Sequence, residues 1–114
     1  MTVHHRLQVQ TESLTHQILD MVERLPKKQQ FLFGRRLSNL VVDAIELQIK
    51  AQQANEERQQ EPLQTIETIW LRIRVLLRIC ADRKLISLGQ LAQVTEKMMK
   101  CEELLEQWKK SLVH

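Results

Sequence analysis

The stretch "SLGQLAQVTEKMMKCEELLEQWKKSL", residues 87–112, decides the fold. Its apolar positions alternate in steps of three and four without a break: Leu91, Val94, Met98, Cys101, Leu105, Trp108 and Leu112. That period is typical of a helix that packs along the seam of a bundle. Ser87 followed by Gln90 matches a capping box, which marks a helix start. The stretch therefore predicts one long helix over about residues 87–113.

The remaining sequence predicts three more amphipathic helices, over about residues 11–25, 27–54 and 63–84. Pro26 suits the first turn of a helix, where its missing N–H costs little. The polar segment "NEERQQEP" is expected to connect the second and third helices. Two short connections favour antiparallel neighbours, so we expect an all-α, up-down-up-down four-helix bundle.

The bundle is expected to form a single domain over residues 11–114, preceded by a loose N-terminus of residues 1–10. A chain of 114 residues with only two glycines and two prolines fits one helical domain. Gly34 lies inside the second helix, where glycine costs about 1 kcal/mol relative to alanine. Either a close helix approach or a bend explains it.

The apolar runs and the cysteines of the sequence also indicate the cellular compartment of the protein. No apolar run approaches the length of a membrane span, and "MTVHHRLQVQ" lacks the apolar region of a signal peptide. Cys80 and Cys101 are isolated, and on adjacent antiparallel helices their levels differ by about 15 Å. A disulfide needs Cα atoms within about 7 Å. We therefore expect a cytoplasmic protein with two buried free thiols and no membrane contact.

Positive charge is concentrated in two segments. Residues 24–36, "RLPKKQQFLFGRR", contain five cationic side chains and no acidic one, and residues 72–84 contain five against Asp82. In an up-down-up-down bundle both segments reach the same end, while the acidic connection lies at the other. We call the following residues the basic pole: Lys27, Lys28, Arg35, Arg36, Arg72, Arg74, Arg78, Arg83 and Lys84. Such polarity suits a phosphate backbone or an acidic protein partner.

The alternative is that these charges only solvate helices and complement their dipoles. Cations near the end of the third helix interact favourably with its dipole, but Lys27 and Lys28 lie at a helix start, where the dipole disfavours them. Phe33 belongs to the apolar stripe of the second helix that is expected to face the core, and Phe31 lies at the edge of that stripe. Neither ring is therefore predicted to stack on bases. Contacts with nucleic acid are therefore expected to be made to the backbone.

The third helix carries a second apolar stripe, formed by Leu71, Val75 and Ile79 and spaced by four. A helix that is apolar on two sides favours contact with another chain, and these residues are candidates for an oligomer interface. The alternative is a wide buried face inside a thick bundle.

Nothing in the sequence indicates catalysis. The four histidines form no metal-binding pattern with one another or with acids, and neither a phosphate-binding glycine loop nor a nucleophile elbow is present. We expect a protein that is not an enzyme and holds no metal or cofactor.

Three segments together resemble a known family. They are "LPKKQQFLFGRRLSNLVVDAIELQIKA" (25–51), "LRIRVLLRICADRKLIS" (71–87) and "ELLEQWKKSL" (103–112). Their order and spacing are similar to the Avd family, small four-helix-bundle accessory proteins of diversity-generating retroelements. A related family encoded by intervening sequences in ribosomal RNA genes matches less clearly.

The resemblance implies a homopentameric barrel with a basic surface. It also implies association with the element's reverse transcriptase and with template-repeat RNA, and possible contact with DNA, in support of mutagenic reverse transcription and retrohoming. On this chain the basic pole would make those contacts, although the net charge of +3 is modest for such a family. The alternative function is a helical adaptor that binds an acidic protein and has no nucleic-acid role.

Overall fold

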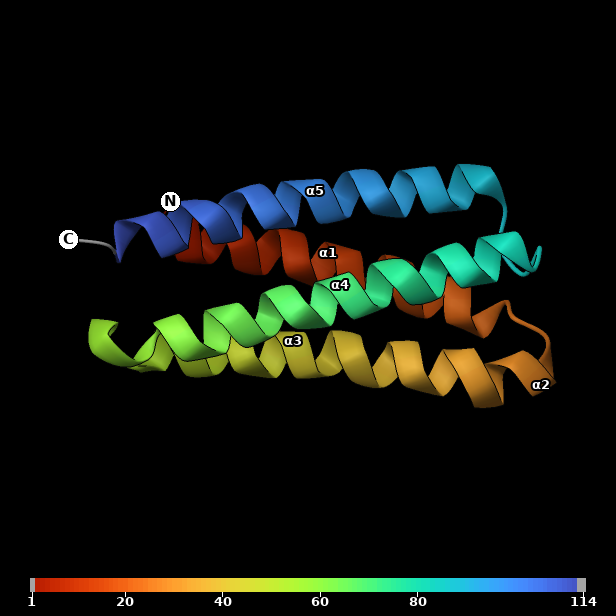
Figure 1. Cartoon of the computed structure of the whole chain (residues 1–114), viewed down its shortest axis with the longest axis horizontal. Helices are drawn as coiled ribbons and strands as arrows, with labels where there is room; N and C mark the ends of the chain where they lie inside the picture. The colour runs from red at the N-terminus through yellow and green to blue at the C-terminus, as the bar shows by residue number, and fades with distance from the viewer. Residues whose placement is uncertain (1, 113–114) are drawn as a thin grey trace.

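Four long helical stretches run antiparallel along a rod of 46 × 23 × 20 Å. The computed structural model describes residues 2–112. The elements in order are α1 (Val3–Glu23), α2 (Lys27–Gln29), η1 (Gln30–Gly34), α3 (Arg35–Gln53), η2 (Glu56–Arg58), α4 (Gln60–Asp82) and α5 (Leu88–Ser111). Figure 1 shows the α1–α2 connection and the α4–α5 turn at one end of the rod, and the α3–α4 connection at the other. The predicted all-α class and four-helix bundle are confirmed.

Each helix packs against two others. α1 contacts α3 and α5, and α4 contacts the same two helices, so α1 and α4 lie diagonally across the bundle. The face of α4 that points away from the shared core is therefore an outer surface of this single chain.

The predicted seam of α5 is buried in the core. Val94, Met98, Cys101, Leu105 and Trp108 are each at most 1 % exposed. Ser87 Oγ accepts a hydrogen bond from Gln90 N at 3.0 Å, and Gln90 Oε1 accepts one from Ser87 N at 2.8 Å, which confirms the capping box.

Both cysteines are buried free thiols, as expected. Burial raises the pKa of Cys80, and it raises the pKa of Cys101 to about 11. A buried neutral thiol behaves as a small apolar side chain, so both cysteines contribute to packing in the core.

The expected loose N-terminus is wrong, because α1 begins at Val3 rather than near residue 11. Thr2 caps the helix by accepting a hydrogen bond from His5 N at 3.2 Å. Leu7 is fully buried, so the first two turns belong to the domain. Met1 and residues 113–114 lie outside the described residues.

The second stretch contains a π-helical segment instead of an uninterrupted α-helix. Arg35 N donates to Gln30 O, five residues earlier, which closes the wide turn of η1. A Cβ atom built on Gly34 would lie 2.9 Å from Val22 Cγ1 of α1. The close approach of α1 therefore accounts for the glycine.

Candidate nucleic-acid interface

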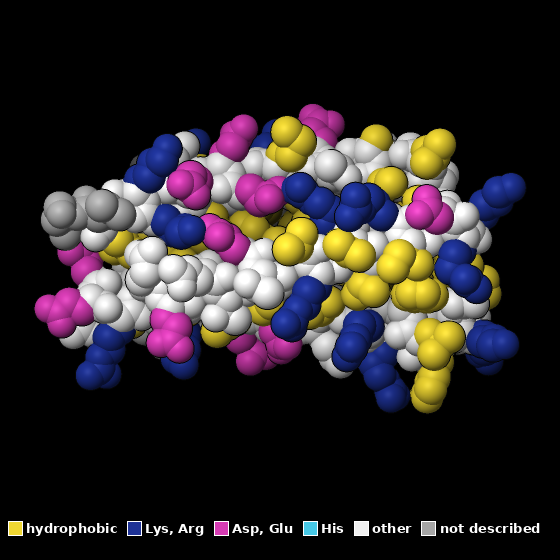
Figure 2. All heavy atoms as spheres, viewed as in Figure 1, with side chains coloured by type: hydrophobic (Ala, Val, Ile, Leu, Met, Phe, Trp, Pro, Cys, Tyr) yellow, Lys and Arg dark blue, Asp and Glu magenta, His cyan; other side chains and the backbone are white. Residues whose placement is uncertain are grey.

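The basic pole is built from both helix connections at one end of the rod. Lys27 and Lys28 lie in the first turn after Pro26, and Arg83 and Lys84 lie in the α4–α5 turn. The other members lie on α3 and α4, closer to the middle of the rod. Every member except Arg74 is exposed. Figure 2 shows Lys and Arg side chains around a group of apolar ones in this half of the molecule.

Ion pairing separates Arg74 from the rest of the basic pole. Arg74 forms a salt bridge with Glu102 across α4 and α5, and Lys109 forms one with Glu67 between the same two helices. Among residues 2–112, the other eight members of the basic pole form no ion pair. Their charges are therefore available to an external anion, whereas that of Arg74 is already compensated.

The α4–α5 turn holds Lys84 in a left-handed conformation, with φ of 62°. Leu85 N donates to Cys80 O at 2.8 Å and Lys84 N donates to Ala81 O at 3.0 Å, which is the Schellman pattern of a helix C-terminus. Glycine usually occupies this position because a side chain there costs about 1 kcal/mol or more. The turn therefore carries a cation where backbone geometry favours glycine.

A groove of about 650 Å³ runs between α3 and α4. Arg36 lies on its α3 wall and Arg72 on its α4 wall, so two members of the basic pole that are far apart in sequence share one depression. Leu71 and Val75 of the second stripe also line it. Asp43 moderates the positive potential on the α3 side. The groove therefore combines cations on opposite walls with an apolar rim.

The side chains of the second stripe are exposed to solvent. Leu71 is 60 % exposed, Val75 37 % and Ile79 38 %. The alternative of a wide buried face inside the bundle is therefore wrong. A contiguous row of exposed apolar side chains on one helix is typical of a surface that contacts another chain.

A protein-family model described as bAvd-like matches residues 6–112, almost the whole of the helical bundle. The chain belongs to the bAvd-like family. This confirms the Avd resemblance drawn from the three sequence segments. No curated protein and no solved structure matches the chain.

Sequence reasoning missed one feature of this bAvd-like surface. Phe31 is 67 % exposed and Leu32 is 55 % exposed, both within η1. The guanidinium carbon of Arg35 lies 4.9 Å from the centroid of the Phe31 ring, within cation–π range. Phe33 is half-buried and packs against the core, as its place on the core stripe predicted. The apolar period placed Phe31 at the edge of the core stripe but gave no signal of its contact with Arg35 or of the π-helical turn that carries it.

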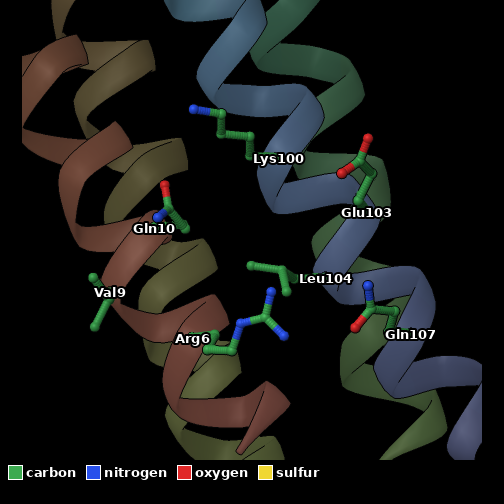
Figure 3. A pocket seen from close by; sticks show the side chains of 7 residues that line it. All are labelled: Arg6, Val9, Gln10, Lys100, Glu103, Leu104 and Gln107. Carbon is green, nitrogen blue, oxygen red and sulfur yellow. The ribbon is translucent and has the colours of Figure 1, made fainter. Parts of the chain in front are cut away.

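A second depression lies on the opposite edge of the bundle, between α1 and α5, with a volume of about 340 Å³. Figure 3 shows Arg6 and Lys100 reaching into it from opposite helices, with Leu104 between them and Glu103 pointing away. Its charges are of both signs and none lies in the basic pole, so it adds nothing to that surface.

The part of the chain that the structure describes holds no group of three His, Cys, Asp or Glu side chains placed to bind a metal ion. Within the same residues, none of the helices has the length and apolar character needed to cross a membrane.

Proposed function

We propose that this bAvd-like protein is a non-enzymatic accessory protein of a diversity-generating retroelement. It binds template-repeat RNA, and DNA where the element presents it, through the basic pole, and it associates with the element's reverse transcriptase. The observation that carries the proposal is the set of eight exposed cations, without ion pairs among the described residues, that extends from one end of the bundle toward its middle, in a family that is accessory and non-catalytic.

The physical support is electrostatic. Each phosphate that a lysine or arginine neutralises releases condensed counterions, which favours binding at low salt. Because the cations come from two connections and two helices, they present a broad surface rather than a point charge. A broad surface suits a backbone that carries many phosphates, and it requires little sequence preference.

The second stripe supports assembly with another chain. We propose that Leu71, Val75 and Ile79 contribute to a homo-oligomer interface, with the pentamer of the family as the expected state. The support is the exposure of three apolar side chains on the outer face of α4, where water rather than protein surrounds them in the single chain.

Nucleic-acid binding is tested by titrating RNA at several salt concentrations. A double charge reversal, Lys28→Glu with Arg83→Glu, is compared with Lys50→Glu and Arg58→Glu, an equal change of charge at exposed positions toward the other end of the rod. We expect the first variant to lose affinity and to flatten the salt dependence by about 0.7 per lost phosphate contact on a single strand. Equal effects of the two double variants would refute a localised interface.

The adaptor alternative predicts a different result. A protein that binds only an acidic partner would retain the reverse transcriptase in a pull-down but would bind no RNA even at low salt. These two results together would refute the nucleic-acid role and support the adaptor role.

The oligomer is tested by light scattering of Val75→Glu, with Gln64→Glu as the control at an exposed polar position of the same helix. We expect dissociation only in the Val75 variant, because a carboxylate in an apolar interface must be desolvated without a partner. A monomeric wild-type protein at high concentration would refute the oligomer.

A further inference from the structure

We propose that Phe31 and Arg35 form a stacking platform for an unpaired nucleobase, so that the basic pole binds single-stranded nucleic acid in preference to duplex. This inference rests on the proposed nucleic-acid role and adds to it the class of strand and a base contact.

The first observation is the distribution of aromatic side chains. The chain has two tryptophans, two phenylalanines and no tyrosine. Trp70 and Trp108 are at most 2 % exposed and Phe33 is half-buried, whereas Phe31 is 67 % exposed. Burying a phenylalanine ring stabilises the folded state by about 1.5 to 3 kcal/mol, and the exposed ring of Phe31 does not supply this stabilisation in the single chain. The one exposed phenylalanine is located inside the run of cations.

The second observation is the contact with Arg35. A guanidinium group 4.9 Å from the ring centroid covers one face of Phe31. Because most of the side chain is exposed, the other face is open to a planar ligand. A base stacked there would meet the π-face of the ring, while the Arg35 charge would lie close enough to attract the adjoining phosphate. One platform therefore provides both contacts that a single strand offers.

The third observation is that the segment beneath the platform is held in place. Gln30 Nε2 donates to Glu23 O at 2.9 Å and to Leu25 O at 2.8 Å, which ties η1 to the end of α1. At the other end of η1, Gly34 packs against Val22. π-helical turns are frequent at functional sites, and a ring held before binding loses less conformational entropy when it binds.

The surroundings favour a nucleobase over an apolar side chain from a protein partner. The cores of protein interfaces are depleted in charge, whereas residues 24–36 contain five cations and no acid. The row suited to a protein contact is the second stripe on α4, because it presents three exposed apolar side chains in succession. Bases of an intact duplex are stacked inside the helix and cannot reach a flat external ring, so the platform selects an unpaired strand.

The test uses a single-stranded RNA oligonucleotide carrying a fluorescent base analogue, and a duplex of the same length. In Phe31→Leu an apolar side chain remains but the π-face is lost, whereas Phe31→Trp retains a stacking surface. We expect Phe31→Leu to weaken single-strand binding by about 5- to 100-fold and to reduce quenching of the base analogue, with Phe31→Trp restoring both. Duplex affinity and the salt dependence should not change, because no charge is removed.

Leu88→Ala is the matched control, because Leu88 is 76 % exposed at the same end of the rod but is not aromatic. An equal loss in Leu88→Ala and Phe31→Leu would overturn the platform. Unchanged single-strand binding in Phe31→Leu would also refute the platform. In that case RNA binding by the wild-type protein would still support the proposed function. A wild-type protein that binds neither oligonucleotide would refute both. Altered oligomer mass in Phe31→Leu with unchanged RNA affinity would assign Phe31 to a protein contact and refute the platform.

Discussion

Replacing Gly34 by alanine tests the contact that supports η1 and the side chains it carries. The added Cβ would lie 2.9 Å from Val22 Cγ1, whereas carbon atoms in ordinary contact are about 3.5 to 4.0 Å apart. The two helices would have to separate by roughly 0.6 to 1 Å, because valine is stiff at χ1 and cannot rotate its methyl groups freely away. Such overpacking costs about 1 to 3 kcal/mol.

Helix propensity acts in the opposite direction. Alanine is favoured over glycine inside a helix by about 1 kcal/mol. The expected net effect of Gly34→Ala is therefore a loss of about 0 to 2 kcal/mol in the free energy of unfolding. In a Val22→Ala background the clashing methyl group is absent, and the same substitution should stabilise by about 0.5 to 1 kcal/mol. The coupling energy between the two sites is expected to be about 1 to 3 kcal/mol.

The assay is urea unfolding of the four proteins, followed by far-ultraviolet circular dichroism at one fixed protein concentration. Fixing the concentration matters because assembly would add to the apparent stability of any variant that still associates. A Gly34→Ala protein more stable than wild type by about 1 kcal/mol, with no coupling to Val22, would refute the close approach as the reason for glycine.

Three further features are tested by substitution and similar unfolding measurements. Lys84→Gly should stabilise by about 1 kcal/mol because it relieves the positive φ, whereas Lys84→Ala, which removes the same charge, should not. Gln48 is 2 % exposed and its amide atoms have no hydrogen-bond partner among the described residues, so Gln48→Met should stabilise by about 1 kcal/mol. Burial raises the pKa of Cys101 to about 11 from an ordinary 9.0. The buried neutral thiol therefore contributes fully to the free energy of unfolding below pH 9, and this contribution is lost as pH rises from 9 toward 11. Cys101→Ala should lose less stability across that window, and equal losses would contradict the raised pKa.

The sequence predicted the elements whose apolar period is regular. The seam of α5 and its capping box appear in the structure as expected, because seven apolar positions in register leave one way for the helix to pack. The two buried thiols followed from the same periodicity. The grouping of the basic pole at one end followed from topology alone, since short connections make neighbouring helices antiparallel.

The start of α1 was missed because a polar residue occupies a core position. Thr11 is 2 % exposed and lies in the buried row between Leu7 and Leu14. Its Oγ1 donates to Leu7 O at 2.8 Å, so the hydroxyl is satisfied within the helix and can be buried. In the sequence a threonine at that position interrupts the apolar stripe, and the stripe therefore seemed to begin at Leu14.

The π-helical turn that carries Phe31 was missed for a different reason. Apolar spacing indicates which face of a regular helix is buried, but it does not report a local change from i+4 to i+5 hydrogen bonding. Arg74 was counted among the cations of the basic pole for a similar reason. Its partner Glu102 is 28 residues away on another helix, so the sequence around Arg74 does not show that its charge is compensated. Pairing across helices depends on their rotation, which charge counting along one segment cannot provide.

The two ends of the rod differ in the charge and exposure of their side chains. At the end opposite the basic pole, Trp108 Nε1 donates to Gln59 Oε1 at 3.0 Å and Gln59 Nε2 donates to Ala54 O at 2.9 Å, so the indole and the Gln59 amide are both paired. At the basic pole, like charges lie together, Lys84 is held at positive φ and an aromatic ring is exposed. Each of these features destabilises the isolated chain. An anionic ligand would offset the like charges and could cover the ring, whereas the cost of the positive φ at Lys84 would remain.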